Sequence, residues 1–341
     1  MKFYQKNYLS VVAQIDRICK SGDSTIVLTL DNTGTSYLGV KNAILNLFPE
    51  NTVIIPAYYS NLLISSKHLR QIAEHLIDVK CKQLILGSFP PCFVDFVKTV
   101  DKRIIVKTIF HGALSELHEE SKQEQFKQLI NLCTSGDISA LGFVKSGLAE
   151  WCRKSFGINA HWLQLIPIQK KVVINKYGEN NIHIGIFGNN SFNKNIINQI
   201  AGALLIENAI IHVFSSGAFF EHFFKERIVV HKLMNHEEFI CLLGSMHLNM
   251  HLSFSEGMGG QTFTESLSLG VPCLTSYNNE YLKKSTYLSD LLIVDQYDNP
   301  FKIGKAISVV LDMNLNQQLI EYSKIMEKEA VLLLNDFLDN S

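Results

Sequence analysis

The sequence lacks the features that mark membrane-spanning, secreted and nucleic-acid-binding proteins. No run reaches the ~20 apolar residues that cross a bilayer, and residues 1–6 (MKFYQK) lack the apolar stretch of a signal peptide. Lysine and arginine number 31 against 32 aspartates and glutamates, a net charge of −1, so a chain-wide basic field is absent. We therefore expect a cytoplasmic protein that binds no nucleic acid. Contact with the inner face of a membrane is left open.

Signatures of a disulfide framework or a zinc site are missing as well. The seven cysteines are an odd number and form no Cys-x-x-Cys pair, and several lie inside apolar runs, as Cys273 does. Such spacing predicts reduced, buried thiols. The histidines show no spacing that would bring three metal ligands together, so we expect His247 and His251 to be core or edge residues and predict no metal site.

The sequence does have enough apolar material for two domains. Its 341 residues are 47% hydrophobic and 18% charged, which excludes a disordered or coiled-coil protein. Short β-branched runs alternate with longer amphipathic ones, a pattern typical of a parallel sheet covered by helices. A polar break at 175–181 (NKYGENN) divides this pattern into two parts.

We therefore predict the α/β class, with two doubly wound, Rossmann-like domains that face a cleft. They span 1–175 and 176–315, and a final helix over 316–341 is a candidate to pack back on the first domain. The predicted strands are 25–31, 52–56, 83–87, 103–109, 138–144, 163–168, 182–188, 210–215, 228–233, 248–254, 273–276 and 291–294. The predicted helices include 36–47, 60–76, 115–133, 146–156 and 315–337.

The strongest functional signal lies in residues 252–272 (LSFSEGMGGQTFTESLSLGVP), which predict a buried strand, a glycine-rich loop and a short helix. Gly257, Gly259 and Gly260 carry no Cβ, so the backbone can approach a ligand closely. The helix start that follows suits a phosphate. Glu256 and Glu265 flank the loop, and a carboxylate can accept two hydrogen bonds from a sugar diol. The plain alternative is a tight strand–helix connection, but turn chemistry alone does not require three glycines between two acids.

This segment resembles the Glu-x7-Glu segment of retaining glycosyltransferases of the GT-B fold, of the family 4 type. The family form is S-x-x-E-G-F-G-x-x-x-x-E-A-x-x-x-G-x-P. Seven positions match it: Ser253, Glu256, Gly257, Gly259, Glu265, Gly270 and Pro272. The two acids lie nine positions apart (265 − 256), one more than in the family, so one residue is inserted near Gly260.

A second stretch, 184–195 (IGIFGNNSFNKN), is similar to the first strand and loop of the family's C-terminal domain. In the family, an arginine and a lysine five positions later neutralise the nucleotide diphosphate there. Lys194 matches the lysine, whereas Asn189 stands where the arginine is expected. Taken alone, Lys194 reads equally well as a solvated lysine at a helix start. The resemblance covers most of residues 138–295.

The resemblance implies a retaining hexosyltransferase. It would move a sugar from a nucleotide-diphosphate sugar to a glycan or lipid-linked acceptor, in surface polysaccharide biosynthesis. Glu256 and Lys194 are then catalytic, and Glu265 holds the ribose. The other implied donor-binding residues are Gly257, Gly259, Gly260, Gln261, Thr262 and Asn189. No cofactor or metal is expected, because the chain has no Asp-x-Asp triplet of the kind that holds Mg²⁺ or Mn²⁺ in the other main glycosyltransferase fold.

In the first half, His111 is the third catalytic candidate and Gly34 is a further donor-binding candidate. His111 follows a predicted strand, and family members often carry a histidine there that touches the donor sugar; a hydrogen-bonded loop histidine is the equal alternative. Gly34 follows the first strand and resembles a loop near the phosphate or acceptor, although an ordinary turn explains it too.

Two other functions stay open at this point. One is a nucleotide-sugar epimerase or hydrolase on the same fold, which the inserted residue and the missing arginine leave room for. The other is a non-catalytic subunit that binds a sugar nucleotide.

Overall fold

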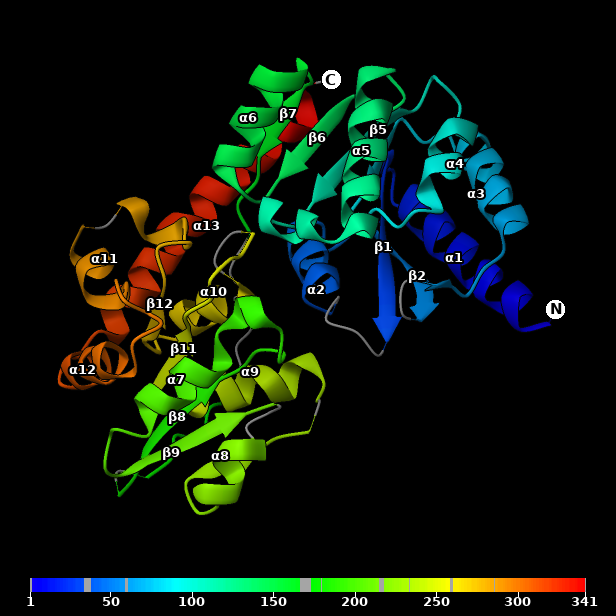
Figure 1. Ribbon diagram of the computed structural model, residues 1–341. Helices are drawn as coiled ribbons and strands as arrows, with labels where there is room; N and C mark the ends of the chain where they lie inside the picture. Colours follow the sequence, from blue (N-terminus) through cyan, green and yellow to red (C-terminus); the bar gives the residue numbers. More distant parts are fainter. Residues whose placement is uncertain are drawn as a thin grey trace. The chain divides into compact units, whose positions relative to one another are not determined.

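The computed structural model describes residues 2–33, 38–58, 61–165, 173–178, 180–214, 218–232, 234–257, 260–284 and 286–340. The chain forms two compact units (Figure 1). Unit 1 comprises Met1–Leu165 and Ala330–Ser341, and unit 2 comprises Ile166–Glu329. Each unit has a largely parallel sheet of its own. In each sheet, the direction in which successive strands are added across the sheet reverses once.

Unit 1 contains a seven-stranded sheet with the order β3-β2-β1-β4-β5-β6-β7. Neighbouring strands are parallel except for the β2–β3 pair. The central strands are near-continuous aliphatic runs because both of their faces are covered. The strands are β1 (Thr25–Thr33), β2 (Thr52–Tyr58), β3 (Asn61–Leu62), β4 (Gln83–Leu86), β5 (Ile105–Phe110), β6 (Ala140–Phe143) and β7 (Ala160–Trp162).

The helices of unit 1 bury one face each against this sheet and form one core. In α3 the buried positions follow the helical period, as in Leu69, Ile72 and Leu76. Gly157 ends α6 in the left-handed conformation that favours glycine. The helices are α1 (Lys2–Lys20), α2 (Leu38–Leu47), α3 (Ser66–Asp78), α4 (Phe93–Thr99), η1 (Leu114–His118), α5 (Glu120–Thr134) and α6 (Ser146–Phe156).

A buried lysine fixes the end of the chain in unit 1. The helix α13 (Asn316–Asp339) begins in unit 2, and its residues from 330 onward belong to unit 1. Lys107 of β5 is fully buried, and its Nζ donates to the backbone oxygens of Phe337 at 2.7 Å, Leu338 at 2.9 Å and Asn340 at 3.0 Å. A cation at the carboxyl end of a helix satisfies the last carbonyls and complements the helix dipole.

Unit 2 contains a five-stranded parallel sheet with the order β10-β9-β8-β11-β12. The strands are β8 (Ile182–Ile186), β9 (Ala209–Val213), β10 (Ile228–Val230), β11 (Leu248–His251) and β12 (Cys273–Thr275). Its helices are η2 (Phe192–Lys194), α7 (Ile196–Ala203), α8 (Ala218–Phe223), α9 (His236–Ser245), α10 (Gln261–Ser268), η3 (Tyr281–Lys284), α11 (Thr286–Leu292) and α12 (Pro300–Leu311).

The helices of unit 2 are divided between the two faces of its sheet. The connections β8–β9 and β10–β11 run in opposite directions across the sheet, and right-handed crossovers therefore place α7 and α9 on opposite faces. α12 packs against α7, and α10 packs against α9. One face thus carries α7 and α12, and the other carries α9 and α10.

Three histidines connect neighbouring strands of unit 2. His183 Nδ1 lies 2.8 Å from His212 Nε2, and His212 Nδ1 lies 2.8 Å from His231 Nε2. Burial, together with the two neighbouring histidines, lowers the pKa of His212 to about 3, so this ring is neutral at neutral pH. His247 accepts a hydrogen bond from the backbone of His183 at 3.0 Å. As expected from the sequence, His247 is a structural residue.

The structure departs from the predicted elements in a few places. The strand predicted at 163–168 is wrong in position: the strand here is β7, which ends at Trp162, because Ala160, His161 and Trp162 form the ladder with β6. Residues 166–168 lie outside the described residues. The strand predicted at 291–294 is the end of α11 followed by one isolated bridge from Ile293 to Thr275. The helices α1 and α4 are not among the predicted elements. The predicted helix 315–337 corresponds to α13.

We expect Lys107→Met to destabilise the protein by roughly 2 kcal/mol, because it keeps the aliphatic stem but removes the donor from three carbonyls at the end of the chain, of which Leu338 O keeps Gln83 Nε2 as a second donor. Urea unfolding measures the loss, and hydrogen exchange should show faster exchange in residues 330–340. Lys127→Met, at an exposed lysine of α5, is the matched control. Equal exchange in the two variants would contradict a role for Lys107 in holding this helix end.

Candidate functional site

The carboxyl ends of β8 and β11 meet where the strand order of unit 2 reverses. From β8 the chain continues to β9 on one side, and from β11 it continues to β12 on the other. The helices that follow, α7 and α10, leave toward opposite faces of the sheet. Open α/β sheets bind ligands in the crevice at such a reversal. Lys194 follows β8 and Glu256 follows β11, so the topology brings both predicted catalytic residues to this point.

The loop after β8 is held in one place. It contains η2 and ends at Asn195, whose backbone is left-handed with a φ of 54°. This conformation costs energy for a residue with a Cβ, although asparagine tolerates it better than most. Asn195 Nδ2 donates to the backbone oxygens of Leu252 at 3.0 Å and Tyr297 at 2.6 Å. These bonds fix the position of Lys194 beside the end of β11.

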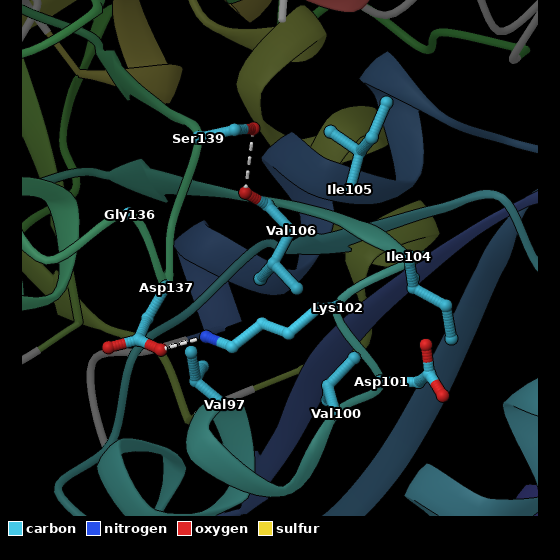
Figure 2. Close-up of a pocket in the computed structure, with 10 residues that line it drawn as sticks. All are labelled: Val97, Val100, Asp101, Lys102, Ile104, Ile105, Val106, Gly136, Asp137 and Ser139. Carbon is cyan, nitrogen blue, oxygen red and sulfur yellow. Dashed lines mark hydrogen bonds and ion pairs between the residues drawn. The ribbon is translucent and has the colours of Figure 1, made fainter.

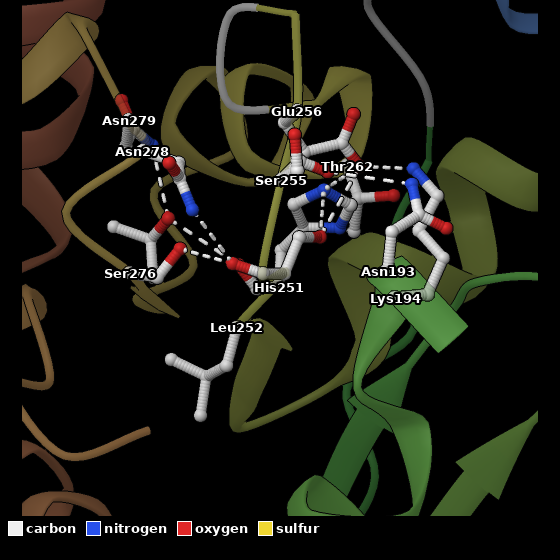
Figure 3. A network of polar contacts seen from close by, with 12 residues as sticks. Asn193, Lys194, His251, Leu252, Ser255, Glu256, Thr262, Ser276, Asn278 and Asn279 are labelled. Carbon is white, nitrogen blue, oxygen red and sulfur yellow. Dashed lines mark hydrogen bonds and ion pairs between the residues drawn. The ribbon is translucent and has the colours of Figure 1, made fainter. Parts of the chain in front are cut away.

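Glu256 is the centre of a cluster of four polar side chains (Figure 3). Its Oε1 accepts hydrogen bonds from Lys194 Nζ, from His251 Nε2 at 2.9 Å and from Ser253 Oγ at 3.1 Å. Only 13% of the Glu256 side chain is exposed. Every one of these contacts goes to Oε1, so within the described residues Oε2 remains available to accept from another donor.

The cluster keeps Glu256 ionised. Burial by itself raises the pKa of this carboxyl, but the hydrogen bond and charge of His251 and the charge of Lys194 outweigh burial. The pKa of Glu256 therefore lies well below its usual range. Because the folded-state pKa is below the unfolded one, the ionised carboxylate stabilises the fold at neutral pH, and this contribution is lost progressively as the pH falls from the unfolded-state pKa through the folded-state pKa.

Gly260 is required by the position of His251. Its φ is +79°, and a Cβ at this position would lie 2.3 Å from His251 Nε2, the atom that bonds Glu256. A side chain there would therefore displace the imidazole from the carboxylate as well as strain the backbone. This glycine has the role expected from the sequence in that it allows close approach, but the group that approaches is a side chain of the protein.

Glu265 lies in α10 and pairs with the first residue of α9. Its Oε1 is 2.9 Å from His236 Nε2. The start of α9 is fixed by a capping box in which Asn235 Oδ1 accepts from the backbone of Glu238 at 2.9 Å, and Glu238 Oε2 accepts from the backbone of Asn235 at 3.1 Å. The cap thereby holds His236 in register with α10.

One oxygen of Glu265 has no hydrogen-bond partner within the described residues. The residue is 2% exposed, and its Oε2 is buried without a donor. Burial raises the pKa of Glu265, and the bond from His236 offsets only part of that effect. Buried acceptors are nearly always satisfied in folded proteins, so an orphan of this kind calls for an explanation. A ligand hydroxyl would supply the missing donor.

The remaining donor-side candidates of unit 2 have the following positions. Gln261 and Thr262 begin α10, where free backbone N–H groups point along the helix axis. Gly257 is buried just after Glu256. Asn189 Oδ1 accepts from the backbone of Ser191 at 3.3 Å, which makes it a turn residue of the loop after β8. Gly259 lies outside the described residues.

In unit 1, His111 directly follows β5, and Gly34 lies outside the described residues. His111 Nε2 is 3.0 Å from the backbone oxygen of Gly87. Burial lowers the pKa of His111 to about 4 despite this bond, so the ring is neutral. A carbonyl oxygen can only accept, which places the proton on Nε2 and leaves Nδ1 as an acceptor.

Two histidines of the site were not among the site residues predicted from the sequence. His251, expected in the core or at an edge, binds Glu256, and His236 binds Glu265. The signal for His251 was its place on the strand that ends beside Glu256. His236 had a weaker signal, namely its position directly after a helix-capping asparagine.

A different hollow, of about 140 Å³, lies in unit 1 (Figure 2). Its lining includes Ile104 to Val106 at the beginning of β5, and the Lys102–Asp137 ion pair. This is the amino-terminal edge of the sheet, whereas ligands of parallel sheets bind at the carboxyl edge. We therefore assign it no function.

In the described ranges, no group of three or more His, Cys, Asp or Glu side chains could hold a metal ion. None of the helices in these ranges is long and apolar enough to span a bilayer.

Solved structures share the fold of both units. α,α-Trehalose-phosphate synthase (UDP-forming) from Burkholderia xenovorans, solved with glucose-6-phosphate, matches with a TM-score of 0.62 and 10% identity over 93% of this chain and 99% of that chain. Anabaena HepE, solved with UDP and glucose, matches with a TM-score of 0.63 and 11% identity, over 91% of this chain and 99% of that chain. Sucrose-phosphate synthase from Thermosynechococcus elongatus matches with a TM-score of 0.64 and 10% identity, over 94% of this chain and 100% of that chain.

The chain has the GT-B glycosyltransferase fold. The fold class predicted from the sequence is thereby confirmed. No protein-family model matches the chain, and no curated protein matches it by sequence.

We expect the stability of Glu265→Gln, measured against the wild type, to increase as the pH rises from 4 to 7, because the amide cannot ionise. The folded-state pKa of Glu265 lies above its unfolded value, so the ionised carboxylate costs stability as the pH rises through the folded-state pKa. Thermal unfolding across this range measures the increase, with Glu237→Gln at an exposed position of α9 as control. A difference in stability between variant and wild type that stays constant from pH 4 to pH 7 would show that the ionised Glu265 does not carry this cost.

Proposed function

We propose that this protein transfers a sugar from a nucleotide-diphosphate sugar to a carbohydrate-containing acceptor, with retention of the anomeric configuration. The observation that carries the proposal is the cluster of Lys194, His251 and Glu256 at the strand reversal of unit 2, next to the start of α10. It combines a fixed cation, a helix N-terminus and a buried carboxylate, which are the groups that a sugar diphosphate requires.

Lys194 and the start of α10 would bind the diphosphate. The ammonium of Lys194 has three N–H groups and gives one to Glu256, so others can reach phosphate oxygens. The backbone N–H groups at the start of α10 would bind further oxygens. Asn189 takes the place of the family's arginine without its charge, and the diphosphate would then depend mainly on Lys194.

Glu265 would accept the ribose hydroxyls of the nucleoside. Its Oε2 is the buried oxygen without a partner, and a vicinal diol supplies two donors to one carboxylate. Glu256 would face the transferred sugar, since its Oε2 can accept from sugar hydroxyls while Oε1 stays bound to the protein. His111 of unit 1 stays a prediction from the resemblance, and its Nδ1 is an acceptor that suits a sugar hydroxyl.

The transfer breaks the bond between the anomeric carbon and the phosphate oxygen, and the electron pair stays with the diphosphate. The acceptor oxygen forms the new bond on the same face, and its proton goes to the released phosphate. Lys194 stabilises the growing negative charge on the leaving group. The ionised Glu256 stabilises the positive charge that develops on the sugar. Retention is proposed from the resemblance of residues 252–272 to the retaining family.

Three finer points stay proposals too. The acceptor would be a glycan or a lipid-linked acceptor, and the pathway would be the synthesis of a surface polysaccharide. Contact with the inner face of a membrane would follow if the acceptor carried a lipid.

A panel of nucleoside diphosphates and nucleotide sugars tests the proposal. At least one should raise the melting temperature, because a ligand that binds only the folded state stabilises it. Incubation of that nucleotide sugar with saccharide acceptors should give a product whose anomeric configuration, read by NMR, matches the donor. Isomerisation of the donor without acceptor would instead identify an epimerase. Absence of any shift across the panel would refute nucleotide-sugar binding.

Lys194→Ala should weaken the binding of the nucleoside diphosphate by about 10- to 100-fold, as loss of a charged hydrogen-bond donor does. The loss should be largest at low salt, where a partly exposed cation is least screened. Calorimetric titration at two ionic strengths measures it, and Lys305→Ala, at an exposed lysine of α12, is the control. If Lys194→Ala matched the control, Lys194 would have no part in the site.

Transfer should continue in excess EDTA, since the proposed leaving-group stabilisation comes from Lys194 and backbone N–H groups. Initial rates with and without EDTA measure this. Complete loss of activity that returns on addition of Mg²⁺ or Mn²⁺ would overturn the metal-free mechanism.

A further inference from the structure

An unusually exposed aromatic ring stands beside the candidate site. Phe192, two positions before Lys194, is 88% exposed, more than any other large apolar residue that the structure describes. Leaving a phenylalanine in water forfeits roughly 2 kcal/mol of burial free energy. Single exposed apolar residues are common and carry no meaning alone. The surroundings of this ring are therefore what matters.

Phe192 stacks on a second ring that belongs to the other loop of the site. The centroids of Phe192 and Phe254 are 5.1 Å apart with an angle of 30° between the rings. Phe254 in turn lies 5.8 Å from the ring of Tyr297. We call these three residues the aromatic platform. Each loop of the site thus carries a platform ring two positions before its charged residue, since Phe254 also precedes Glu256 by two.

Backbone contacts hold the platform at a fixed place relative to the charged cluster. The N–H of Phe254 donates to the backbone oxygen of Asn193 at 2.8 Å, and Asn193 Nδ2 donates to the backbone oxygen of Ser255 at 3.4 Å. Asn195 ties Tyr297 to the same loop. A binding surface that is already ordered loses little entropy when a ligand docks.

Two of the three platform residues, Phe192 and Tyr297, lie in loops that lead to helices on the opposite face of the sheet from the proposed nucleoside position. Tyr297 leads into α12, which packs with α7 on one face of the sheet, whereas Glu265 and His236 belong to α10 and α9 on the other face. A ligand with its ribose at Glu265 and its diphosphate at Lys194 therefore meets the platform with its other end. That end is the sugar and not the base.

We propose that the aromatic platform binds the C–H face of a pyranose ring, with Phe192 as the outermost stacking residue. The inference rests on the proposed function. An aromatic face carries negative charge density that attracts the weakly positive C–H groups of a sugar, and the hydroxyls at the sugar's edge can then reach the free Oε2 of Glu256. Two sources offer such a ring: the sugar of the donor and the terminal sugar of the acceptor.

Three variants test the platform. Phe192→Ala removes the ring, Phe192→Tyr keeps it, and Phe219→Ala removes a ring of α8 that is 66% exposed and lies outside the platform, as a matched control. Two measurements are made on each full-length variant. Calorimetry gives the Kd of UDP, ADP and GDP and of UDP-glucose, ADP-glucose and GDP-mannose. Saturation-transfer NMR gives the binding of methyl α-D-glucopyranoside and maltose.

Phe192→Ala should leave the affinity for the nucleoside diphosphate within twofold of the wild type, and Phe192→Tyr should behave as the wild type in both measurements. If the donor sugar occupies the platform, Phe192→Ala weakens the binding of the nucleotide sugar by about three- to tenfold. If the acceptor occupies it, the affinity for the nucleotide sugar is unchanged and the saturation transfer to the free saccharide is lost.

The opposite results separate this inference from the function on which it rests. The platform would be refuted if Phe192→Ala behaved like Phe219→Ala in both measurements. It would also be refuted if Phe192→Ala lost equal affinity for the nucleoside diphosphate and for the nucleotide sugar, because the ring would then bind the nucleotide. Should the wild type bind no nucleotide while Phe192 still governs saccharide binding, the proposed function fails and the platform stands.

Discussion

A buried carboxylate that must remain charged determines the local structure of unit 2. Glu256 loses most of its hydration, and protein donors must replace the lost water. Lys194, His251 and Ser253 supply them, all at the same oxygen. Because the lysine and the carboxylate follow different strands, their two loops have to pack against each other. The left-handed backbone of Asn195 follows from this requirement.

The two acids of the site have opposite electrostatic environments. Glu256 is hydrogen-bonded to a lysine and a histidine, and its pKa is lowered. Glu265 is hydrogen-bonded to one histidine, and its pKa is raised. Environment rather than residue type therefore separates their chemistry. A permanently ionised group suits the place where positive charge develops on a sugar. Glu265 destabilises the fold because one of its buried oxygens has no donor. A ligand that supplies this donor removes the destabilisation, and the free energy recovered contributes to ligand binding.

Much of the fold could be predicted because it depends on local patterns. Apolar strand runs and helical periods are visible in the chain, and the segment around Glu256 shows its strand, its glycine-rich loop and its helix directly in the sequence. The exposed Phe192 and the pairing of Glu265 with His236 were not visible, because they depend on which loops meet in space. His251 illustrates the limit. Its sequence context is that of a core strand. Its hydrogen bond to Glu256 depends on the three-dimensional arrangement, in which Gly260 leaves room for the imidazole.

The two acids of the site stand on separate elements of unit 2, and each is fixed by its own contacts. Glu256 is fixed by the end of β11, and Glu265 is fixed by the register of α10 against α9 through His236. Neither constraint involves the length of the connecting loop. The distance in sequence is thus a weaker guide to this site than the elements on which the two acids stand.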